Sequence, residues 1–352
     1  MGREEFPVGT QADANSEGSF DMKKIIIPVL MAAATIVPAA ATAEGTPITV
    51  EIAYDKALLA SDAGAAVVLD IETGDVLAMV STPAFDPNDF VNGISGTAYA
   101  ELRDNPRSPL YPRAHGGVYP PGSTFKMVVA TAALESGAVK PTDRVHCNGY
   151  YHFGNRTWHC WKKGGHGSMD MHNGIKHSCD VYFYETARRT GVEQIAATAR
   201  KFGFGEAWTL GMTGARGGLV PDPEWKQRVM GEPWYEGETL NFGIGQGQLG
   251  VTPLQLALMT ARIANEGHSF KPKLVGLGPK SDGDGVLDAP LDAEIMQRMK
   301  AGMFGVTSEG GGTAYRSGDL GLGGPRLAGK TGTAQVRRIT KGAGVPVVYD
   351  SI

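Results

Sequence analysis

The sequence predicts an α+β domain, in which an antiparallel sheet carries a largely helical subdomain. Two observations support this fold class. Short apolar runs of strand composition lie near both ends of the patterned region, at residues 65–80 and 326–336. Between them, from about residue 123 to residue 303, apolar residues recur at helical spacing. Strands at both ends of a helical stretch are typical of domains whose terminal segments share one sheet.

The first two expected strands form a hairpin. Residues 65–70 are apolar enough for a buried strand, residues 72–75 form a turn, and residues 76–80 form the returning strand. Residues 82–112 contain five prolines and few apolar runs, which predicts a long irregular loop. At the other end, residues 326–336 combine β-branched residues with glycines. This composition suits a strand that a ligand or another backbone approaches closely.

The spacing of apolar residues predicts the helices. The first begins near Ser123, and a later one begins at Pro253, with Thr252 in the N-cap position. The full set of expected helices is 123–136, 178–187, 192–201, 253–263 and 291–303. Polar residues 141–173 are rich in Cys, His, Trp and Gly, and we expect them to form loops. Residues 243–250 are expected to be a glycine-rich turn near the site rather than a phosphate loop, because the Lys-Ser/Thr pair is missing.

Charge and the N-terminal residues bound the class of protein. Lys and Arg total 33 against 37 Asp and Glu, so the net charge of −4 predicts no nucleic-acid partner. A basic start, an apolar run and an A-x-A ending match a secretory signal peptide, which predicts export to the periplasm. An uncleaved anchor in the inner membrane through residues 25–41 is the alternative. The expected regions are a disordered leader (1–21), a signal peptide or membrane anchor (22–43), a short linker (44–64) and one catalytic domain (65–352).

Ser123 and Lys126 form the first candidate catalytic pair. Pro120, Pro121 and Gly122 resist helix, so Ser123 lies where an extended segment turns into a helix. Unpaired backbone N–H groups at such a point favour a developing oxyanion. Lys126, three residues on, lies over the same helix face, and a partly desolvated lysine can take the proton of an alcohol. A serine that caps a helix, followed by an ordinary surface lysine, is the commoner explanation of such a pair. Further motifs in the chain are therefore needed to support a catalytic role.

Two more polar clusters follow in order. They are Ser178 and Asp180, near the start of a predicted helix, and Lys330, Thr331, Gly332 and Thr333, on the last predicted strand. With the first pair they make S-x-x-K, S-x-D and K-T-G-T, close to the motif set of class A β-lactamases and penicillin-binding proteins. Each motif alone is common by chance. All three in this order, on these elements, are a specific signal.

These motifs carry a resemblance to a known family. From about residue 65 to residue 336, the chain resembles the transpeptidase domain of class B penicillin-binding proteins, in particular their elongation-type branch. The matching stretches are LAMVSTPAFDPN (77–88), YPPGSTFK (119–126), GIGQG (243–247), TPLQ (252–255) and GKTGTAQ (329–335). The resemblance implies a serine transpeptidase/β-lactamase-like fold and a peptidoglycan D,D-transpeptidase that β-lactams acylate.

The resemblance also implies a role for each site residue. Ser123 attacks the carbonyl of a D-Ala-D-Ala stem peptide, Lys126 takes its proton, and Ser178 relays a proton to the leaving amine. The positively charged Lys330 and the segment of Thr331, Gly332 and Thr333 bind the substrate carboxylate, and the N–H groups of Ser123 and Thr333 form the oxyanion hole. The chemistry needs no cofactor. The implied partners are stem peptides, β-lactam antibiotics and the cell-elongation machinery in the membrane.

Three features depart from the usual pattern of the family. Asp180 stands where most relatives have Asn, although the elongation branch resembles this chain here, and an ionised Asp180 opposes Lys126 as a base. The linker at residues 44–64 is shorter than the non-catalytic module of the family. Residues 337–352 are too few for its last strands, so we expect a C-terminally truncated domain. The alternatives are a serine β-lactamase, a D,D-carboxypeptidase or a catalytically incompetent fragment.

The three cysteines of the chain lie in one short stretch together with a histidine. Cys147, Cys160, His166 and Cys179 follow the spacing C-x12-C-x5-H-x12-C, a sound tetrahedral ligand set for one structural zinc ion. The resemblance supports zinc, because some elongation-type relatives carry a zinc site here with other ligand types. Two alternatives stay open, a Cys147–Cys160 disulfide with Cys179 free, or three unlinked thiols. Other candidate ligands are His146, His152, His159, His172 and His177.

Overall fold

The structure, a computed structural model, describes residues 63–274, 290–319 and 327–334. The expectations for the leader, for the signal peptide or anchor, and for all but the end of the linker lie outside these residues. Within the described ranges, no helix has the length and apolar character needed to cross a membrane.

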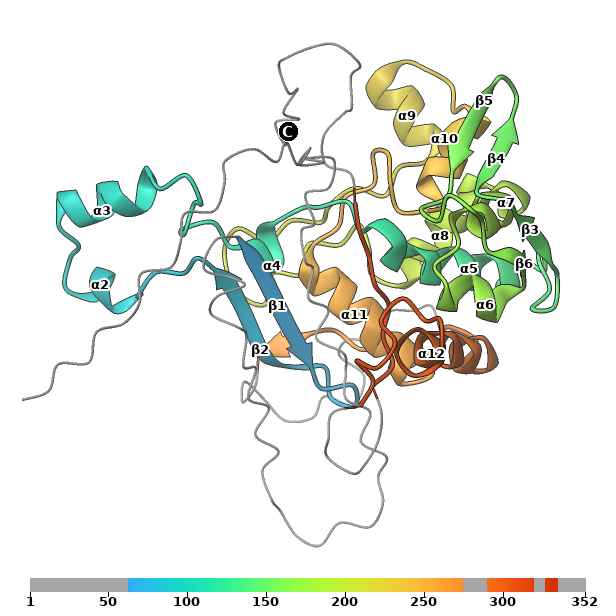
Figure 1. Ribbon diagram of the computed structural model, residues 1–352. Coiled ribbons are helices and arrows are strands. Elements are labelled where there is room, and N and C mark those ends of the chain that lie inside the picture. Colours follow the sequence, from blue (N-terminus) through green and yellow to red (C-terminus); the bar gives the residue numbers. More distant parts are fainter. Residues whose placement is uncertain (1–62, 275–289, 320–326, 335–352) are drawn as a thin grey trace, which may run out of the picture.

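The predicted hairpin is confirmed and belongs to a three-stranded sheet. β1 (Gly64–Leu69) and β2 (Asp75–Thr82) pair antiparallel. Asp70 Oδ1 holds the turn between them by accepting hydrogen bonds from two backbone N–H groups of that turn, at 2.8 and 2.9 Å. β7 (Lys273–Leu274) runs parallel to β2 on its other side (Figure 1). The sheet is therefore mixed: the predicted antiparallel pairing is present between β1 and β2, and β7 adds a short parallel strand that was not predicted.

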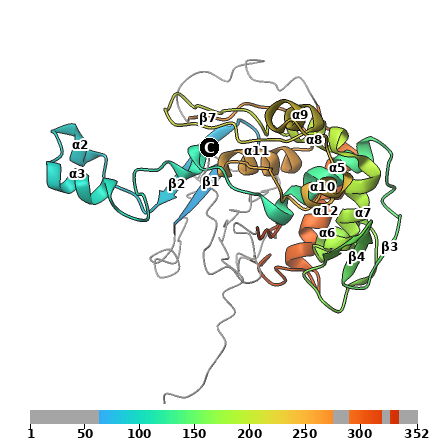
Figure 2. The ribbon, with the colours of Figure 1, turned by 90° about the horizontal axis from the view of Figure 1, so that it is seen from above.

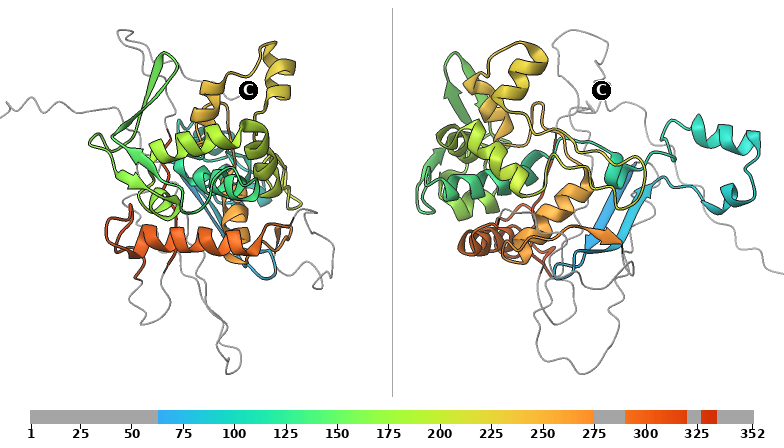
Figure 3. Two further views of the ribbon diagram at one scale, coloured as in Figure 1. Left: turned by 90° about the vertical axis from the view of Figure 1, so that its right-hand side faces the viewer. Right: turned by 180° about the vertical axis from the view of Figure 1, so that it is seen from behind.

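Helices are the main regular elements in the rest of the described structure, as predicted. The helices of this part are η1 (Gly122–Phe125, a 3-10 turn), α5 (Lys126–Glu135), α6 (Met171–Lys176), α7 (Asp180–Thr190), α8 (Val192–Lys201), α9 (Pro223–Met230), α10 (Glu236–Phe242), α11 (Pro253–Ala264) and α12 (Ala293–Ser308). All five predicted helices are confirmed, while α6, α9 and α10 were not foreseen. In Figure 3, α12 lies along one side of the helical subdomain, where it packs against α5, α6 and α11.

Helix α11 joins the sheet to the helical subdomain. Its residues divide between two hydrophobic cores: Leu254, Leu258 and Ala261 face the sheet, and Leu256, Met259 and Ile263 face the helices. Offsets of three and four residues place each triplet on one side of the helix. Because both sides are buried, α11 fixes the position of the helical subdomain relative to the sheet, and the site lies on the subdomain side.

The predicted loop at residues 82–112 is only partly irregular. It contains α2 (Asn88–Val91) and α3 (Gly96–Arg103), and α4 (Arg113–Gly116) follows it. Ser95 Oγ caps α3 by accepting a hydrogen bond from the Ala98 N–H at 3.1 Å. Helices α2 and α3 bury none of their residues, and Figures 1 and 2 show them extending away from the rest of the domain. The prolines of this segment lie outside both helices, which explains why the prolines did not prevent helix formation.

Two further predictions are wrong, a loop at residues 141–173 and a strand at residues 327–334. The supposed loop at 141–173 contains two small antiparallel pairs. They are β3 (Val145–Cys147) with β6 (Gly167–Met169), and β4 (Tyr150–Phe153) with β5 (Arg156–His159). Conversely, residues 327–334, predicted as a strand, contain no strand in the described structure. The remainder of that predicted strand, residue 326 and residues 335–336, lies outside the described residues.

Candidate active site

Ser123 lies in the single turn of η1, which leads directly into α5. Gly122 has a φ of +56°, a conformation that glycine adopts readily, and its N–H donates to the Gly245 carbonyl at 3.0 Å. A side chain at Gly245 would collide with the Gly122 backbone, so the glycine-rich turn packs here as predicted. Ser123 is partly exposed, and its hydroxyl makes no hydrogen bond to another described residue. The hydroxyl is therefore open to an incoming ligand.

Lys126 is the first residue of α5 and is fully buried. Its Nζ donates hydrogen bonds to Asp180 Oδ1 at 2.6 Å, to the Ser178 carbonyl at 2.9 Å and to Ser178 Oγ at 3.3 Å. The next seven residues of α5 are also buried, so this helix lies within the core. A buried ammonium requires such partners, because its transfer from water is otherwise very costly.

The S-x-D motif supplies these partners at the start of α7. Cys179 occupies the N-cap position, where its sulfur accepts a hydrogen bond from the Tyr182 N–H at 3.5 Å, and Asp180 is the first helical residue. Ser178 has a φ of +50°, which costs a residue other than glycine about 1–3 kcal/mol. This backbone conformation turns both the Ser178 carbonyl and its hydroxyl toward Lys126, and the surrounding contacts compensate for the strain.

Lys330 approaches the same serine from the other side. It is 4% exposed, and its Nζ donates to Ser178 Oγ at 2.9 Å and to the Thr331 carbonyl at 2.8 Å. Burial, and then the positive charge of Lys126, hold the pKa of Lys330 well below its usual value, against the opposing effect of Asp180. The Ser178 hydroxyl thus lies between two buried amines. Among the described residues, Asp180 is the carboxylate that forms an ion pair with either of them.

The K-T-G-T segment also lies against the turn that carries Ser123. A side chain at Gly332 would collide with Thr124 and the Pro121 carbonyl, and one at Gly122 would collide with the Thr333 backbone. Thr331 and Thr333 are exposed and border the site. The structure therefore brings together all three motifs, although up to 207 residues separate them in the chain, from Ser123 to Lys330.

Comparisons with known proteins agree with this convergence. The family model described as "Penicillin binding protein transpeptidase domain" matches residues 64–344. The chain belongs to this family. The peptidoglycan D,D-transpeptidase MrdA of Acinetobacter baumannii is 41% identical over 297 residues, which cover 81% of this chain and 43% of that protein. MrdA of Escherichia coli K12 is 36% identical over 293 residues, covering 80% and 46%.

Solved structures of penicillin-binding proteins resemble the domain as well. Pseudomonas aeruginosa PBP2, in complex with WCK 5153, matches with a TM-score of 0.69 and 45% identity, over 74% of this chain and 58% of that one. Helicobacter pylori PBP2, in complex with MreC, matches with a TM-score of 0.68 and 32% identity, over 75% and 49%. The chain spans about half the length of the curated relatives it matches.

Two residues of this transpeptidase domain contact the motifs and were not recognised in the sequence. The Thr313 hydroxyl lies 2.7 Å from the Thr331 hydroxyl. Trp161 donates its backbone N–H to Asp180 Oδ2 at 2.9 Å and its indole N–H to the Ser178 carbonyl at 3.1 Å. Their positions, directly after three glycines and directly after Cys160, were the available signals.

The four predicted metal ligands of the penicillin-binding domain lie together. One ligand atom from each of Cys147, Cys160, His166 and Cys179 falls within 4.8 Å of the other three. His166 Nδ1 is 3.6 Å from the sulfur of Cys147 and 3.5 Å from that of Cys160. Tetrahedral zinc, with Zn–S of about 2.3 Å and Zn–N of about 2.0–2.1 Å, places nitrogen and sulfur about 3.6 Å apart. The donor set therefore fits a zinc ion.

Two further observations at the cysteine cluster bear on the ligand set. All three cysteines are buried free thiols, without a disulfide between them in the described structure. A hydrogen bond from the Cys179 thiol, and then one from His166, lower the pKa of Cys160, while the same bond raises the pKa of Cys179. His166 Nε2 is buried without a hydrogen-bond partner among the described residues. A cluster that already favours a thiolate is suited to a cation.

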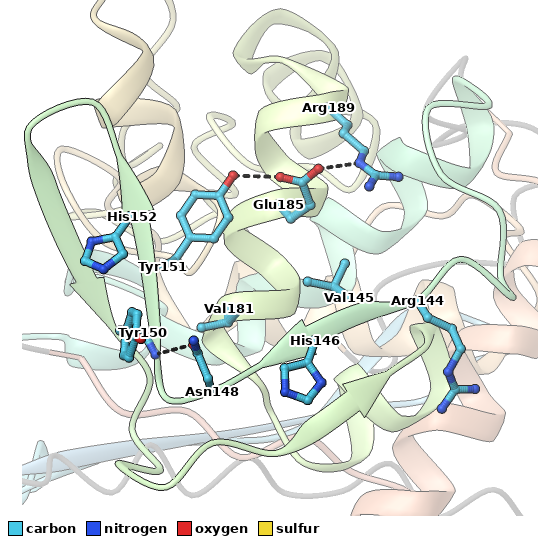
Figure 4. Close-up of a pocket in the computed structure, with 10 residues that line it drawn as sticks. All are labelled: Arg144, Val145, His146, Asn148, Tyr150, Tyr151, His152, Val181, Glu185 and Arg189. Carbon is cyan, nitrogen blue, oxygen red and sulfur yellow. Dashed lines mark hydrogen bonds and ion pairs between the residues drawn. The ribbon is translucent and has the colours of Figure 1, made fainter.

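A separate pocket of about 370 Å³ lies farther along α7, between this helix and strands β3 and β4 (Figure 4). Its centre is Glu185, which accepts hydrogen bonds from the Tyr151 hydroxyl at 2.6 Å and from Arg189 at 2.6 Å. Burial opposes ionisation of Glu185, but hydrogen bonds from Arg188, Tyr151 and Arg189 lower its pKa to about 2. None of the residues of the three motifs lines this pocket, so it is distinct from the active site.

Proposed function

We propose that this protein is a peptidoglycan D,D-transpeptidase that works through an acyl-enzyme on Ser123. The observation that carries the proposal is the Ser178 hydroxyl between two buried amines, beside an open serine at a helix start. Class B penicillin-binding proteins cross-link stem peptides with this motif set, and the relatives named above are D,D-transpeptidases. Peptidoglycan stem peptides are the proposed substrates, and β-lactams the proposed inhibitors.

The two amines suggest how the site meets the need for a base. Asp180 forms an ion pair with Lys126, whereas burial and the neighbouring charge of Lys126 lower the pKa of Lys330. When the carboxylate of a stem peptide binds near Lys330 and Thr331, it favours a charged Lys330. The proton moves from Lys126 to Ser178 Oγ while the Ser178 proton moves to Lys330, and Lys126 becomes neutral.

Acyl transfer follows from that state. Ser123 Oγ forms a bond to the D-alanyl carbonyl carbon as its proton passes to Lys126, and the N–H groups of Ser123 and Thr333 stabilise the oxyanion. The C–N bond then breaks as Ser178 passes its proton to the leaving D-alanine amine and takes one from Lys126, and an ester remains on Ser123. The amine of a neighbouring stem peptide attacks this ester and gives its proton to Lys126. The ester C–O bond breaks, Lys126 returns that proton to the Ser123 oxygen, and the cross-link is formed.

Labelling with a fluorescent penicillin tests the proposal. We expect a stable adduct on the wild-type chain and none on Ser123→Ala. Ser136→Ala is the matched control, because Ser136 lies at the other end of α5 with its hydroxyl bonded to the Ala132 carbonyl at 2.7 Å, and it should label normally. Rapid turnover of the label would instead indicate a β-lactamase or carboxypeptidase. A folded chain that never labels would indicate an incompetent fragment, and equal labelling of Ser123→Ala would refute the nucleophile.

We further propose one structural zinc ion held by Cys147, Cys160, His166 and Cys179. Four protein ligands leave no open position, so the ion would tie the segment of β3–β6 to the start of α7 without taking part in the reaction. Elemental analysis should find about one zinc per chain, lost in Cys147→Ser and retained in the exposed control His152→Ala. Thiol alkylation after unfolding in chelator distinguishes the alternatives. Three modified thiols fit zinc or free cysteines, and a single one fits a disulfide.

We also propose that the chain is exported and that it binds a partner from the elongation machinery. A signal peptide or anchor at residues 22–43 is consistent with export to the periplasm or the inner membrane. H. pylori PBP2 was solved in complex with MreC, and we propose that this chain likewise binds elongation machinery. Fractionation of cells that produce the full chain tests the location, and a tagged chain that does not retain an MreC-type partner would contradict the assembly.

A further inference from the structure

We propose that Trp161 is a positioning residue for acyl transfer, which fixes Ser178 and Asp180 against Lys126. The inference rests on the proposed function. Trp161 follows Cys160 in the segment between β5 and β6, yet its hydrogen bonds are to residues 177–180. The indole N–H is shared between the carbonyls of His177 and Ser178, at 3.1 Å each.

The Ser178 carbonyl and the Asp180 carboxylate, which both accept hydrogen bonds from Lys126, also accept hydrogen bonds from Trp161. Asp180 Oδ1 accepts a hydrogen bond from Lys126 Nζ at 2.6 Å, and Asp180 Oδ2 accepts one from the Trp161 N–H at 2.9 Å. The Ser178 carbonyl accepts from Lys126 Nζ at 2.9 Å and from the Trp161 indole at 3.1 Å. Movement of Trp161 therefore displaces both anchors of the buried amine.

Ser178 has particular need of such support. Its φ of +50° is unfavourable for a residue other than glycine, so the turn holds this shape only while neighbouring groups favour it. The shape directs the Ser178 hydroxyl between Lys126 and Lys330. The indole donates to the carbonyls on both sides of the Ser178 N–Cα unit, which is where a hydrogen bond can hold that dihedral.

The ring of Trp161 contributes little to the core. The residue is 58% exposed, and its aromatic neighbour is the His166 ring, with centroids 5.1 Å apart. An exposed large side chain that forms hydrogen bonds to the active-site turn is better explained by positioning than by packing. Trp161→Phe keeps an aromatic ring and the backbone donor, but it removes the indole N–H together with the pyrrole part of the ring. Trp208→Phe makes the same loss at a hydrogen bond outside the site, so comparison of the two variants isolates the proposed role.

Acylation kinetics test the inference. We measure the Kd and the acylation rate constant of a chromogenic penicillin for the wild-type chain, Trp161→Phe and Trp208→Phe. Trp208 is the matched control, since its indole also donates to a backbone carbonyl, that of Gly203 at 3.1 Å, outside the active site. We expect Trp161→Phe to acylate about tenfold more slowly with Kd changed less than twofold, as for loss of one hydrogen bond to a positioned group. Trp208→Phe should acylate normally.

The outcomes distinguish a positioning role of Trp161 from a ligand contact and from a structural role. Normal acylation of Trp161→Phe overturns the inference, and so does a change confined to Kd, which would mean that the indole contacts the ligand. Slower acylation with loss of zinc or a lower Tm would indicate a structural role and also overturns it. Hydrogen exchange of amides 178–181 gives an independent readout if the wild type does not acylate. It should be faster in Trp161→Phe than in Trp208→Phe, and equal rates refute the inference whether or not the proposed function holds.

Discussion

Asp180→Asn removes the negative charge that faces the buried Lys126 and changes little else in shape. The Nζ and Oδ1 atoms are 2.6 Å apart, and the two side chains are 0% and 11% exposed. Asp180 uses one oxygen for Lys126 and the other for the Trp161 N–H. An amide has one oxygen, so its NH2 group must face one of these two donors. The substitution therefore either leaves the Lys126 amine with only the Ser178 carbonyl and hydroxyl as acceptors, or leaves the Trp161 N–H without its acceptor.

The structure sets the size of the effect. At 2.6 Å the ion pair is worth about 6 kcal/mol at an effective dielectric constant of about 20, before the cost of desolvation. Removing one partner of a buried pair costs about 3–5 kcal/mol, because the other charge stays buried. The Asn oxygen retains one hydrogen bond, so we expect a loss of about 3 kcal/mol at pH 7. That loss corresponds to a decrease in Tm of roughly 6–12 °C for a domain of this size.

Urea unfolding followed by tryptophan fluorescence measures this loss, and a double-mutant cycle assigns it to the pair. In the Lys126→Met background, Asp180→Asn should cost less than about 1 kcal/mol, because no buried ammonium remains. Asp104→Asn is the control, since Asp104 pairs with Arg103 at the exposed surface, and it should leave the urea midpoint unchanged. If Asp180→Asn lowers the free energy of unfolding equally in both backgrounds, the ion pair with Lys126 is not the cause of the loss.

Three further predictions follow from described contacts. Thr313→Val removes the hydrogen bond to the Thr331 hydroxyl and should weaken penicillin binding about threefold to tenfold in a competition assay, with Tm little changed. Glu185 has a pKa of about 2, below its usual 4.5, so the stability advantage of wild type over Glu185→Gln should be full above about pH 4.5 and disappear in acid unfolding as the pH falls toward about 2. The pKa of Lys330 is lowered in the folded state, so the unfolded chain binds more protons in the window below pH 10.5. The stability of wild type relative to Lys330→Met should therefore rise with pH toward 10.5 in urea titrations, and a fall would contradict the burial of a destabilised charge.

Elements with a strong local pattern could be predicted from the sequence. The hairpin of β1 and β2 combines a period of buried residues with a turn, and α11 has a capping threonine, an N1 proline and apolar residues on both sides. The meeting of the motifs was predicted from their order and from the resemblance. The ligand set of Cys147, Cys160, His166 and Cys179 was predicted from donor type and spacing, and the structure places those four atoms together.

Elements that depend on tertiary contacts could not be predicted in this way. Strands β3 and β6 have three residues each, too few for a period of two to be visible, and they pair across a segment of polar residues. α3 was hidden by the prolines around it, although its Ser95 cap was a readable signal. Thr313 contacts the site through a hydroxyl, and Trp161 contacts it through hydrogen bonds to a carboxylate and a backbone carbonyl. Such contacts follow from chain placement and leave no pattern in the sequence.

The sequence predicts a conflict, because Asp180 lies beside Lys126, the lysine proposed as the base. The geometry adds a second lysine to this site. The motifs supply two buried amines, not one, and both reach the Ser178 hydroxyl, at 3.3 Å from Lys126 and 2.9 Å from Lys330. One carboxylate in the described site can compensate one buried positive charge, so a second proton on the pair is unfavourable. Asp180 pairs with Lys126, while Lys330 forms no ion pair with a carboxylate among the described residues, so the two amines differ in their charge environment. In the proposed mechanism, the substrate carboxylate supplies the missing negative charge beside Lys330, which links the appearance of a base for Ser123 to the binding of substrate.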